Sequence, residues 1–248
     1  MRRPVGVVLM EEVGQTQWIR FMNPAVSDSS MLALRVFVVE ENPLIRLAIG
    51  HLVEEMPGGC LVGASDSSSE TLSALQSLRA DLVILELANR EGAGMDLIRD
   101  LRIRHPQVRI LVLSSHSEEL FAHRALQAGA DGFVSKKLDL DVIRSAIGKV
   151  AAGETYLSPE LAARLALKHL GIGSAAGASD LEDLSNRELQ VFRLMGSGQT
   201  TRCIAEALGI SIKTVESHID HLKRKLGVEN GVALIHKAVQ WMERGILQ

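Results

Sequence analysis

The chain has 248 residues, of which 46% are hydrophobic, and its formal net charge is −3. That length suits two domains of ordinary size, and the hydrophobic share is enough for a core in each. A net negative charge argues against a protein that binds nucleic acid over its whole surface, so any such contact must come from a local cluster of cations.

No segment of the sequence predicts a membrane protein. The longest apolar runs, such as Val5–Met10 and Leu82–Leu85, are far shorter than the roughly 20 residues that span a bilayer. The N-terminus has no secretory h-region and no small-residue cleavage site. We therefore expect a cytoplasmic protein with no membrane partner.

The two cysteines, Cys60 and Cys203, are far apart and have no partners at metal-ligand spacing. Neither a disulfide framework nor a zinc site is indicated, and we expect two buried thiols.

Residues 1–34 carry Arg2 and Arg3, a short apolar patch and then polar residues. We expect a poorly ordered extension to which no function is assigned. The alternative is a start codon placed too early, with Met31 as the true start.

From Arg35 onward, short β-rich runs alternate with helical stretches in which apolar residues recur every three to four positions. The predicted strands are Val36–Val39, Cys60–Ala64, Leu82–Leu85, Ile110–Leu113 and Gly132–Val134. The predicted helices are Pro43–Glu55, Glu70–Leu78, Met95–Arg104, Glu118–Ala128 and Asp139–Ala152. Five such units predict an α/β domain over residues 35–158 with a doubly wound, five-stranded parallel sheet.

Polar residues follow four of these strands. They are Glu40 and Glu41, Glu86, Ser114 with Ser115, and Lys136. In open parallel sheets the ligand crevice lies at the carboxyl ends of the strands, so we expect these side chains to converge. The alternative is chance, because every strand must emerge into solvent somewhere.

The order of these residues, together with Asn42-Pro43 and Ala128–Gly132, resembles the receiver domain of response regulators. The resemblance implies roles for six residues. Glu40 and Glu41 match the acidic pair that holds Mg²⁺, Glu86 the phosphoacceptor, Ser114 and Lys136 the groups that bind the phosphoryl oxygens, and Phe133 the aromatic switch.

This chain departs from the receiver pattern at the phosphoacceptor. Glu86 stands where the family has Asp, both members of the acidic pair are Glu, and the loop 88–94 lacks the usual Met-Pro and is one residue off the common length. An error near 1 Å in the position of the acceptor can cost roughly 10²-fold in rate, and an extra methylene moves the carboxylate by about that much. We therefore predict a receiver that is not switched by phosphorylation, in which Glu86 holds part of the negative charge that a phosphoryl group would bring. The alternative is that Glu86 only forms a structural ion pair with Lys136.

Residues 159–180 are expected to form a linker. A short helix near Glu160–Leu170 is followed by the small, glycine-rich stretch Gly171–Ser179. The boundary between the two domains therefore falls there, and the second domain covers residues 181–248.

The second domain is predicted to be an all-α unit of four helices. Asn186–Met195 and Thr201–Leu208 precede a longer helix over Ile212–Leu226, which begins after the N-cap Ser211 and ends at Gly227. The apolar stripe of the longer helix is Ile212, Val215, Ile219, Leu222 and Leu226. The tight turns between the three helices fit helix-turn-helix geometry.

The face opposite that stripe is polar and charged. An ordinary three-helix bundle with a solvated face would fit this periodicity equally well. However, Leu184–Leu189, Ile204–Ile210, Lys213–His218 and Lys223–Gly227 resemble the LuxR-type helix-turn-helix of NarL/FixJ response regulators. With the resemblance, the residues expected to contact double-stranded DNA are Lys213, Thr214, Glu216, Ser217, Asp220, His221, Lys223 and Arg224. Asp220 is expected either to accept from a cytosine amino group or to pair with Arg224. Lys213 and the cluster Lys223–Lys225 would supply the local positive charge.

A last helix is predicted over about Gly231–Met242. Its apolar positions Val232, Ile235, Val239 and Met242 recur at helical spacing, and Leu234, Ala238 and Trp241 add apolar surface. Part of this surface could simply cover the bundle. In the resembled family the helix pairs with its copy, which would present two recognition helices to half-sites about one turn of DNA apart, so we expect a homodimer.

Together these patterns predict a transcription regulator that is not an enzyme and needs no cofactor. One alternative is a Mg²⁺-dependent phosphotransferase or phosphatase that uses Glu40, Glu41 and Glu86, because a carboxylate cluster can hold a hard cation. The other is an interaction protein gated by a ligand or partner, which dimerises with another regulator. The sequence does not identify a sensor kinase, an input signal or a target gene.

Overall fold

The computed structural model describes residues 33–87, 94–169, 181 and 183–246. Most of the predicted N-terminal extension, including Met31, lies outside these residues. The same holds for nearly all of the loop 88–94 and for the glycine-rich stretch 171–179. Within the described ranges no helix is long and apolar enough to cross a bilayer.

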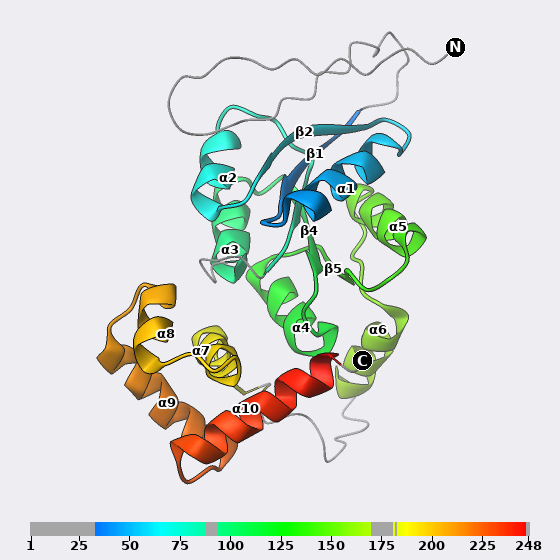
Figure 1. Cartoon of the computed structure of the whole chain (residues 1–248). Coiled ribbons are helices and arrows are strands. Elements are labelled where there is room, and N and C mark those ends of the chain that lie inside the picture. Colours follow the sequence, from blue (N-terminus) through cyan, green and yellow to red (C-terminus); the bar gives the residue numbers. More distant parts are fainter. Residues whose placement is uncertain (1–32, 88–93, 170–180, 182, 247–248) are drawn as a thin grey trace.

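The first body is a five-stranded parallel sheet with the order β2-β1-β3-β4-β5 (Figure 1). Its strands are β1 (Leu34–Val39), β2 (Gly59–Ser65), β3 (Leu82–Leu85), β4 (Arg109–Ser114) and β5 (Gly132–Ser135). Every residue of β3 is buried, as expected for a strand covered on both faces. Because β1 lies between β2 and β3, the strand order reverses there, and the carboxyl ends of β1, β3, β4 and β5 line one edge.

Helices cover both faces of the sheet. Alternate residues of each strand point to opposite faces, so Val36 and Ile84 join one apolar cluster and Phe37 and Val83 the other. The first cluster packs beneath α1 (Pro43–Glu54) and α5 (Leu140–Ala151). The second packs beneath α2 (Ser68–Ala74), α3 (Gly94–Arg104) and α4 (Glu118–Ala128). The predicted doubly wound α/β fold is therefore confirmed.

The second body consists of α7 (Asn186–Gly196), α8 (Thr201–Leu208), α9 (Ile212–Leu226) and α10 (Gly231–Ile246). Side chains mark where the helices begin: Ser185 and Glu188 form a capping box on α7, and Ser211 accepts from the Thr214 N–H at the start of α9. Gly227 ends α9 with a φ of 63°, the left-handed conformation that favours glycine. The predicted all-α unit of four helices is confirmed.

Three local predictions were wrong. The second helix of the sheet domain runs over Ser68–Ala74 rather than Glu70–Leu78, because Ser67 caps it early and the chain turns after Leu75. Cys203 is exposed, since α8 turns Ile204, Ala205 and Leu208 inward instead, and Cys60 is only half-buried. Ile212 is 47% exposed because it lies in the first turn of α9, ahead of the packed residues.

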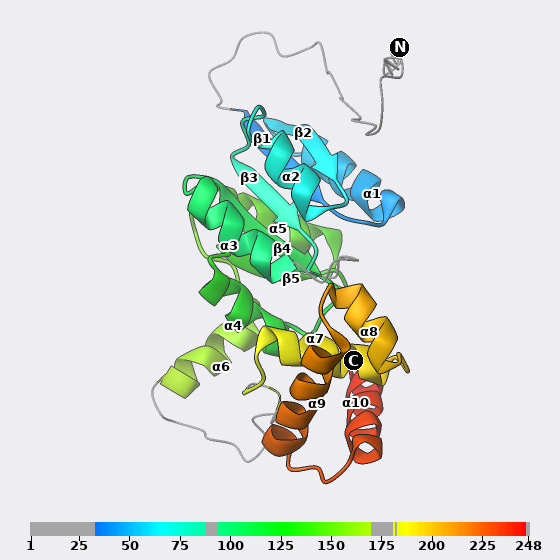
Figure 2. The same ribbon diagram turned by 90° about the vertical axis from the view of Figure 1, so that its left-hand side faces the viewer.

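The two bodies are in contact through α4 and α7 (Figures 1 and 2). The buried apolar residues beneath α3 and α4 form one continuous cluster with Leu181, Leu184 and the core of the helical body. Arg124 on α4 donates to the Leu181 carbonyl at 2.9 Å and to Asn186 Oδ1 at 3.1 Å. The connecting helix α6 (Pro159–His169) is held at its start by a bond of 2.9 Å from the Ser158 N–H to Glu118.

Candidate functional sites

The strand ends bring Glu40, Glu86, Ser114 and Lys136 together. Glu86 directly follows β3, and the Ser114 hydroxyl at the end of β4 donates to its Oε1. Its Oε2 accepts from the Ser115 N–H at 3.1 Å and from Lys136 Nζ at 2.9 Å. The Glu86 residue is only 6% exposed, so all of these bonds lie in a medium of low polarity.

Lys136 bridges two carboxylates. Its ammonium contacts Glu40 Oε2 as well as Glu86, and Glu40 is itself buried, accepting from the Asn42 N–H at 2.9 Å. One cation thus faces two anions, and each anion has further hydrogen bonds. Charged groups can be buried only when an opposite charge and hydrogen bonds compensate for the lost water, as they do here.

The same arrangement does not fit the bound Mg²⁺ implied by the resemblance. The Lys136 ammonium already lies against the two carboxylates, Glu40 and Glu86, that would have to hold the metal. Among the described residues, no group of three or more His, Cys, Asp or Glu side chains could hold a metal ion. Glu41, the other member of the acidic pair, is half-buried.

Phe133, which matches the aromatic switch, is fully buried. It belongs to the strand that pairs with β4, the strand that ends at Ser114. It lies in β5 within the cluster beneath α2, α3 and α4. A fully buried aromatic ring here means that the edge of the sheet is packed on this side, next to the strand end that carries Lys136.

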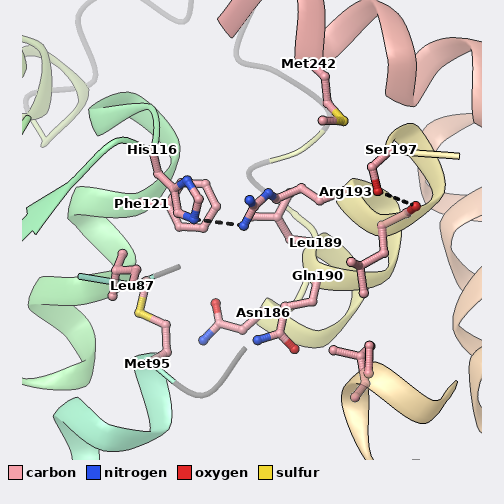
Figure 3. Close-up of a pocket in the computed structure, with 13 residues that line it drawn as sticks. Leu87, Met95, His116, Phe121, Asn186, Leu189, Gln190, Arg193, Ser197 and Met242 are labelled. Atoms are coloured by element: carbon pink, nitrogen blue, oxygen red, sulfur yellow. Dashed lines mark hydrogen bonds between the residues drawn. The ribbon is translucent and has the colours of Figure 1, made fainter. Parts of the chain in front are cut away.

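Two residues that the patterns did not single out connect this cluster to the helical body. The His116 N–H donates to Ser114 Oγ at 3.2 Å, and the His116 ring lies beside Phe121, with centroids 4.6 Å apart. Arg193 Nη1, from α7, is 2.8 Å from His116 Nε2 (Figure 3). A guanidinium can only donate, so Nε2 accepts and the imidazole is neutral.

The protonation of His116 is strongly disfavoured. Burial and the nearby Arg193 charge lower the pKa of His116 to about 4, with Lys136 adding to the effect and Glu86 opposing it. Burial also lowers the pKa of Arg193. No periodicity could have revealed this pair, because its members are 77 residues apart and meet only when the two bodies dock.

The polar face of α9 is open. Figures 1 and 2 show that most of α9 lies away from the sheet. Of the predicted DNA-contacting residues, all are exposed except the half-buried Lys223: Lys213, Thr214, Glu216, Ser217, Asp220, His221 and Arg224. Within the described part of the chain, neither Lys213 nor Arg224 has an ion-pair partner.

Two charges near α9 differ from expectation. Asp220 pairs with Lys223 at 2.7 Å rather than with Arg224, and its hydrogen bond with Lys223 lowers the pKa of Asp220. Lys225 turns inward, donating to Glu188 at 2.8 Å and to the Asp183 carbonyl at 3.0 Å. The cationic cluster is therefore smaller than predicted, because the buried Glu188 of the capping box needs a counter-charge.

The last helix has two apolar sides. Leu234 and Ala238 are fully buried in the helical body, and Trp241 lies 5.8 Å from Phe192 between ring centroids. On the other side Val232 is 78% and Ile235 43% exposed. The other two predicted dimer residues, Val239 and Met242, are half-buried.

Comparison with known proteins extends these observations. Residues 36–148 match the response regulator receiver domain, and residues 182–238 match the bacterial regulatory proteins of the luxR family. The transcriptional activator protein ExaE of Pseudomonas putida is 37% identical over 214 residues, covering 86% of this chain and 98% of that protein. The response regulator UvrY of Escherichia coli is 28% identical over 207 residues, covering 84% of this chain and 94% of that one.

Solved structures of a response regulator match this chain over both of its bodies. A structure of the RcsB response regulator of Salmonella typhimurium matches with a TM-score of 0.66 and 25% identity, over 85% of this chain and 98% of that one. RcsB from Salmonella enterica serovar Typhimurium, bound to the promoter rprA in the presence of the phosphomimetic BeF₃⁻, matches with a TM-score of 0.62 and 27% identity, over 82% and 96% of the two chains. Both domains match a family model, ExaE is 37% identical over most of the chain, and RcsB has the same two-body architecture. The chain therefore belongs to the NarL/FixJ response regulators, DNA-binding regulators of transcription in which a receiver domain is joined to a LuxR-type helix-turn-helix.

Proposed function

We propose that this protein regulates transcription by binding a specific DNA site as a homodimer, and that its receiver works without a phosphoryl group on Glu86. The observation that carries the second half is the bonding of the Glu86 carboxylate. It accepts from the Ser114 hydroxyl and from Lys136, the two groups that the receiver family uses to bind phosphoryl oxygens. Glu86 thus occupies those groups with its own negative charge.

The mimicry of a phosphoryl group is partial. A carboxylate brings one charge and two oxygens, against roughly −1.5 to −2 and three oxygens for a phosphoryl group. Extra hydrogen bonds are expected of any buried ion pair, so their presence does not decide between a signalling and a structural role. The identity of the donors supports a signalling role for Glu86, because Ser114 and Lys136 are the groups that would otherwise meet a phosphoryl group.

Two experiments test this role. Incubating the protein with a small phosphoryl donor and Mg²⁺ should leave its intact mass unchanged, and a stoichiometric gain of one phosphoryl group would refute the proposal. Glu86→Gln keeps the shape and removes the charge, so it should lower DNA affinity and the dimer fraction. Glu54→Gln, on the exposed side of α1, removes the same charge as a control. Equal behaviour of parent and Glu86→Gln would leave Glu86 a structural residue.

DNA binding is assigned to the exposed face of α9. RcsB, of the same architecture, has been solved bound to promoters and as two dimers on two parallel DNAs. By that analogy Lys213 and Arg224 would reach phosphates and Ser217 a base edge. Selection of bound sequences from random DNA with the full-length protein tests the assignment. No enrichment would contradict it and favour an interaction protein that pairs with another regulator.

The homodimer is assigned to the exposed side of α10. Val232 and Ile235 leave an apolar strip uncovered. Val232→Asp should keep the circular dichroism of the parent, since the side chain is exposed, while lowering the dimer fraction in sedimentation and the affinity for a two-half-site operator. Lys237→Asp is unsuitable as a control because Lys237 caps the Leu226 carbonyl, so Gln240→Asp, on an exposed position of the same helix, serves instead. Unchanged dimerisation of Val232→Asp would place the interface elsewhere.

As a regulator bound to DNA, the protein would act in the cytoplasm, and its activity would not require Mg²⁺. A second candidate, gating of DNA binding by a small ligand, is favoured by a cleft between the two bodies.

A further inference from the structure

A cleft of about 190 Å³ lies between the receiver and the helical body. Its receiver side is mainly apolar and includes Leu87, Met95 and Phe121. The α7 side carries polar groups at the spacing of one helix face, among them Asn186, Gln190 and Arg193 (Figure 3). The cleft is therefore mainly apolar, because Leu189, Leu194 and Leu208 also line it, and its polar groups form one strip along α7.

Among the described residues, the cation in this cleft, Arg193, has no salt-bridge partner, although the charge of Glu86 acts on it from a greater distance. Arg193 donates to the neutral ring of His116, and none of the described carboxylates forms a salt bridge with it. Burial lowers the pKa of Arg193 and the charge of Glu86 only partly opposes this, so its surroundings on balance disfavour its charge. A partly buried guanidinium without a hydrogen-bonded carboxylate is costly, and a carboxylate that met it in two parallel hydrogen bonds would reduce that cost.

Size limits what can enter. Cavities of about 150 Å³ lined by apolar side chains hold a benzene molecule, so a cleft slightly larger than that has room for one ring and a small substituent. We propose that the cleft binds a small carboxylate with a compact apolar body, an aromatic or branched-chain acid. Arg193 holds the carboxylate, and the apolar body lies against Met95 and Phe121.

The site has a consequence for regulation because both bodies form its walls. A ligand held by Arg193 of α7 and by the receiver side chains stabilises the docked arrangement, and Leu208, at the end of the helix before α9, lines the same cleft. The gating of DNA binding by this ligand rests on the proposed DNA-binding function, whereas ligand binding itself does not.

Benzoate is the probe, titrated into the full-length protein by calorimetry and by ligand-observed NMR. We expect saturable binding with a Kd below about 1 mM. Benzamide has the same shape without the charge and should bind at least about tenfold weaker, as should benzoate to Arg193→Gln. Arg202→Gln, which removes a positive charge from the exposed face of α8, should bind benzoate like the parent.

Three results would overturn the proposal: no saturable binding of benzoate, equal binding of benzamide, or equal binding by Arg193→Gln. If Arg193→Gln fails to fold, Ala207→Phe decides, because Ala207 lines the cleft from an exposed position and a larger side chain there should block benzoate. The titration contains no DNA. Failure to bind benzoate therefore leaves the proposed DNA-binding function intact, and failure to bind DNA leaves the ligand site intact.

Discussion

Charged side chains are paired in the receiver pocket but partly unpaired on α9. At the strand ends, Lys136 pairs with the two buried carboxylates Glu40 and Glu86, and all three residues belong to the same body. On α9, Lys213 and Arg224 stand exposed with no ion-pair partner among the described residues. Charges that are paired internally stabilise one conformation, whereas exposed, unpaired cations of one sign are available to an external anion. The contrast fits the proposed roles, in which the receiver pocket keeps one conformation and α9 contacts the phosphates of DNA.

The largest expected effect comes from breaking the internal pairing. Lys136→Met leaves Glu40 and Glu86 buried without their cation, which should lower the free energy of unfolding by about 3–5 kcal/mol. Urea denaturation followed by circular dichroism measures it. Adding Glu86→Gln should restore part of the loss, because one of the two uncompensated charges is then gone.

The exposed neighbour Lys137 provides the control. Lys137→Met should change the free energy of unfolding by no more than about 0.5 kcal/mol. A loss of similar size in the two methionine variants would contradict the view that Lys136 is distinguished by its buried partners.

The next effect tests the contact between the receiver and the helical body, where His116 meets Arg193 of α7. The pKa of His116 is about 4 in the folded protein against 6.5 ordinarily, so the unfolded chain takes up this proton first as the pH falls. The stability from the neutral ring is complete above pH 6.5 and is lost progressively toward pH 4. The loss should reach about 3 kcal/mol.

His116→Gln isolates this contribution. Its side-chain amide oxygen can still accept from Arg193 but does not titrate, so the parent and the variant should diverge as the pH is lowered through this window. Unfolding curves that stay parallel from pH 7 to pH 4 would rule out His116 as the titrating group.

A smaller effect, on binding rather than folding, should follow from removing the exposed cations. Lys213→Ala and Arg224→Ala should each weaken binding to all DNA sequences and reduce the slope of log affinity against log salt by about 1. Ser217→Ala should instead change which sequences are preferred, with little change in that slope. Fluorescence anisotropy over a salt series separates the two outcomes, and an unchanged slope in both cation variants would remove α9 from the interface.

The smallest effect sharpens the comparison at an exposed exception. Asp220 and Lys223 form an exposed pair on α9 that resembles the internal pairing of the receiver. Asp220→Asn releases Lys223 for phosphate contact and removes an acid from the DNA side, so affinity should rise slightly, by less than Arg224→Ala lowers it. Weaker binding would mean that Asp220 itself accepts from a base.

Periodicity and capping residues predicted nearly all of the helices and strands to within two residues, because their determinants are local. Glu86, Ser114 and Lys136 could also be placed together, since parallel strands bring their carboxyl ends to one edge. The inward turn of Lys225 could not be foreseen, because it depends on Glu188, 37 residues away and buried by its capping role. The contact of His116 with Arg193 depends on docking two bodies across a linker, and neither residue lies in a pattern that reports it.

The bond from Ser114 to Glu86 bears on timing. An acyl phosphate is made by one reaction and removed by another, so a receiver that carries one holds its signal for a limited lifetime. The charge of Glu86 belongs to the covalent structure of the chain and cannot be hydrolysed away, and Ser114 and Lys136 meet it as soon as the sheet has folded. On the proposed role of Glu86, no phosphoryl group limits the lifetime of the signal. The output of the receiver would then follow the amount of protein made and degraded, and any faster response would have to come from molecules that bind and leave.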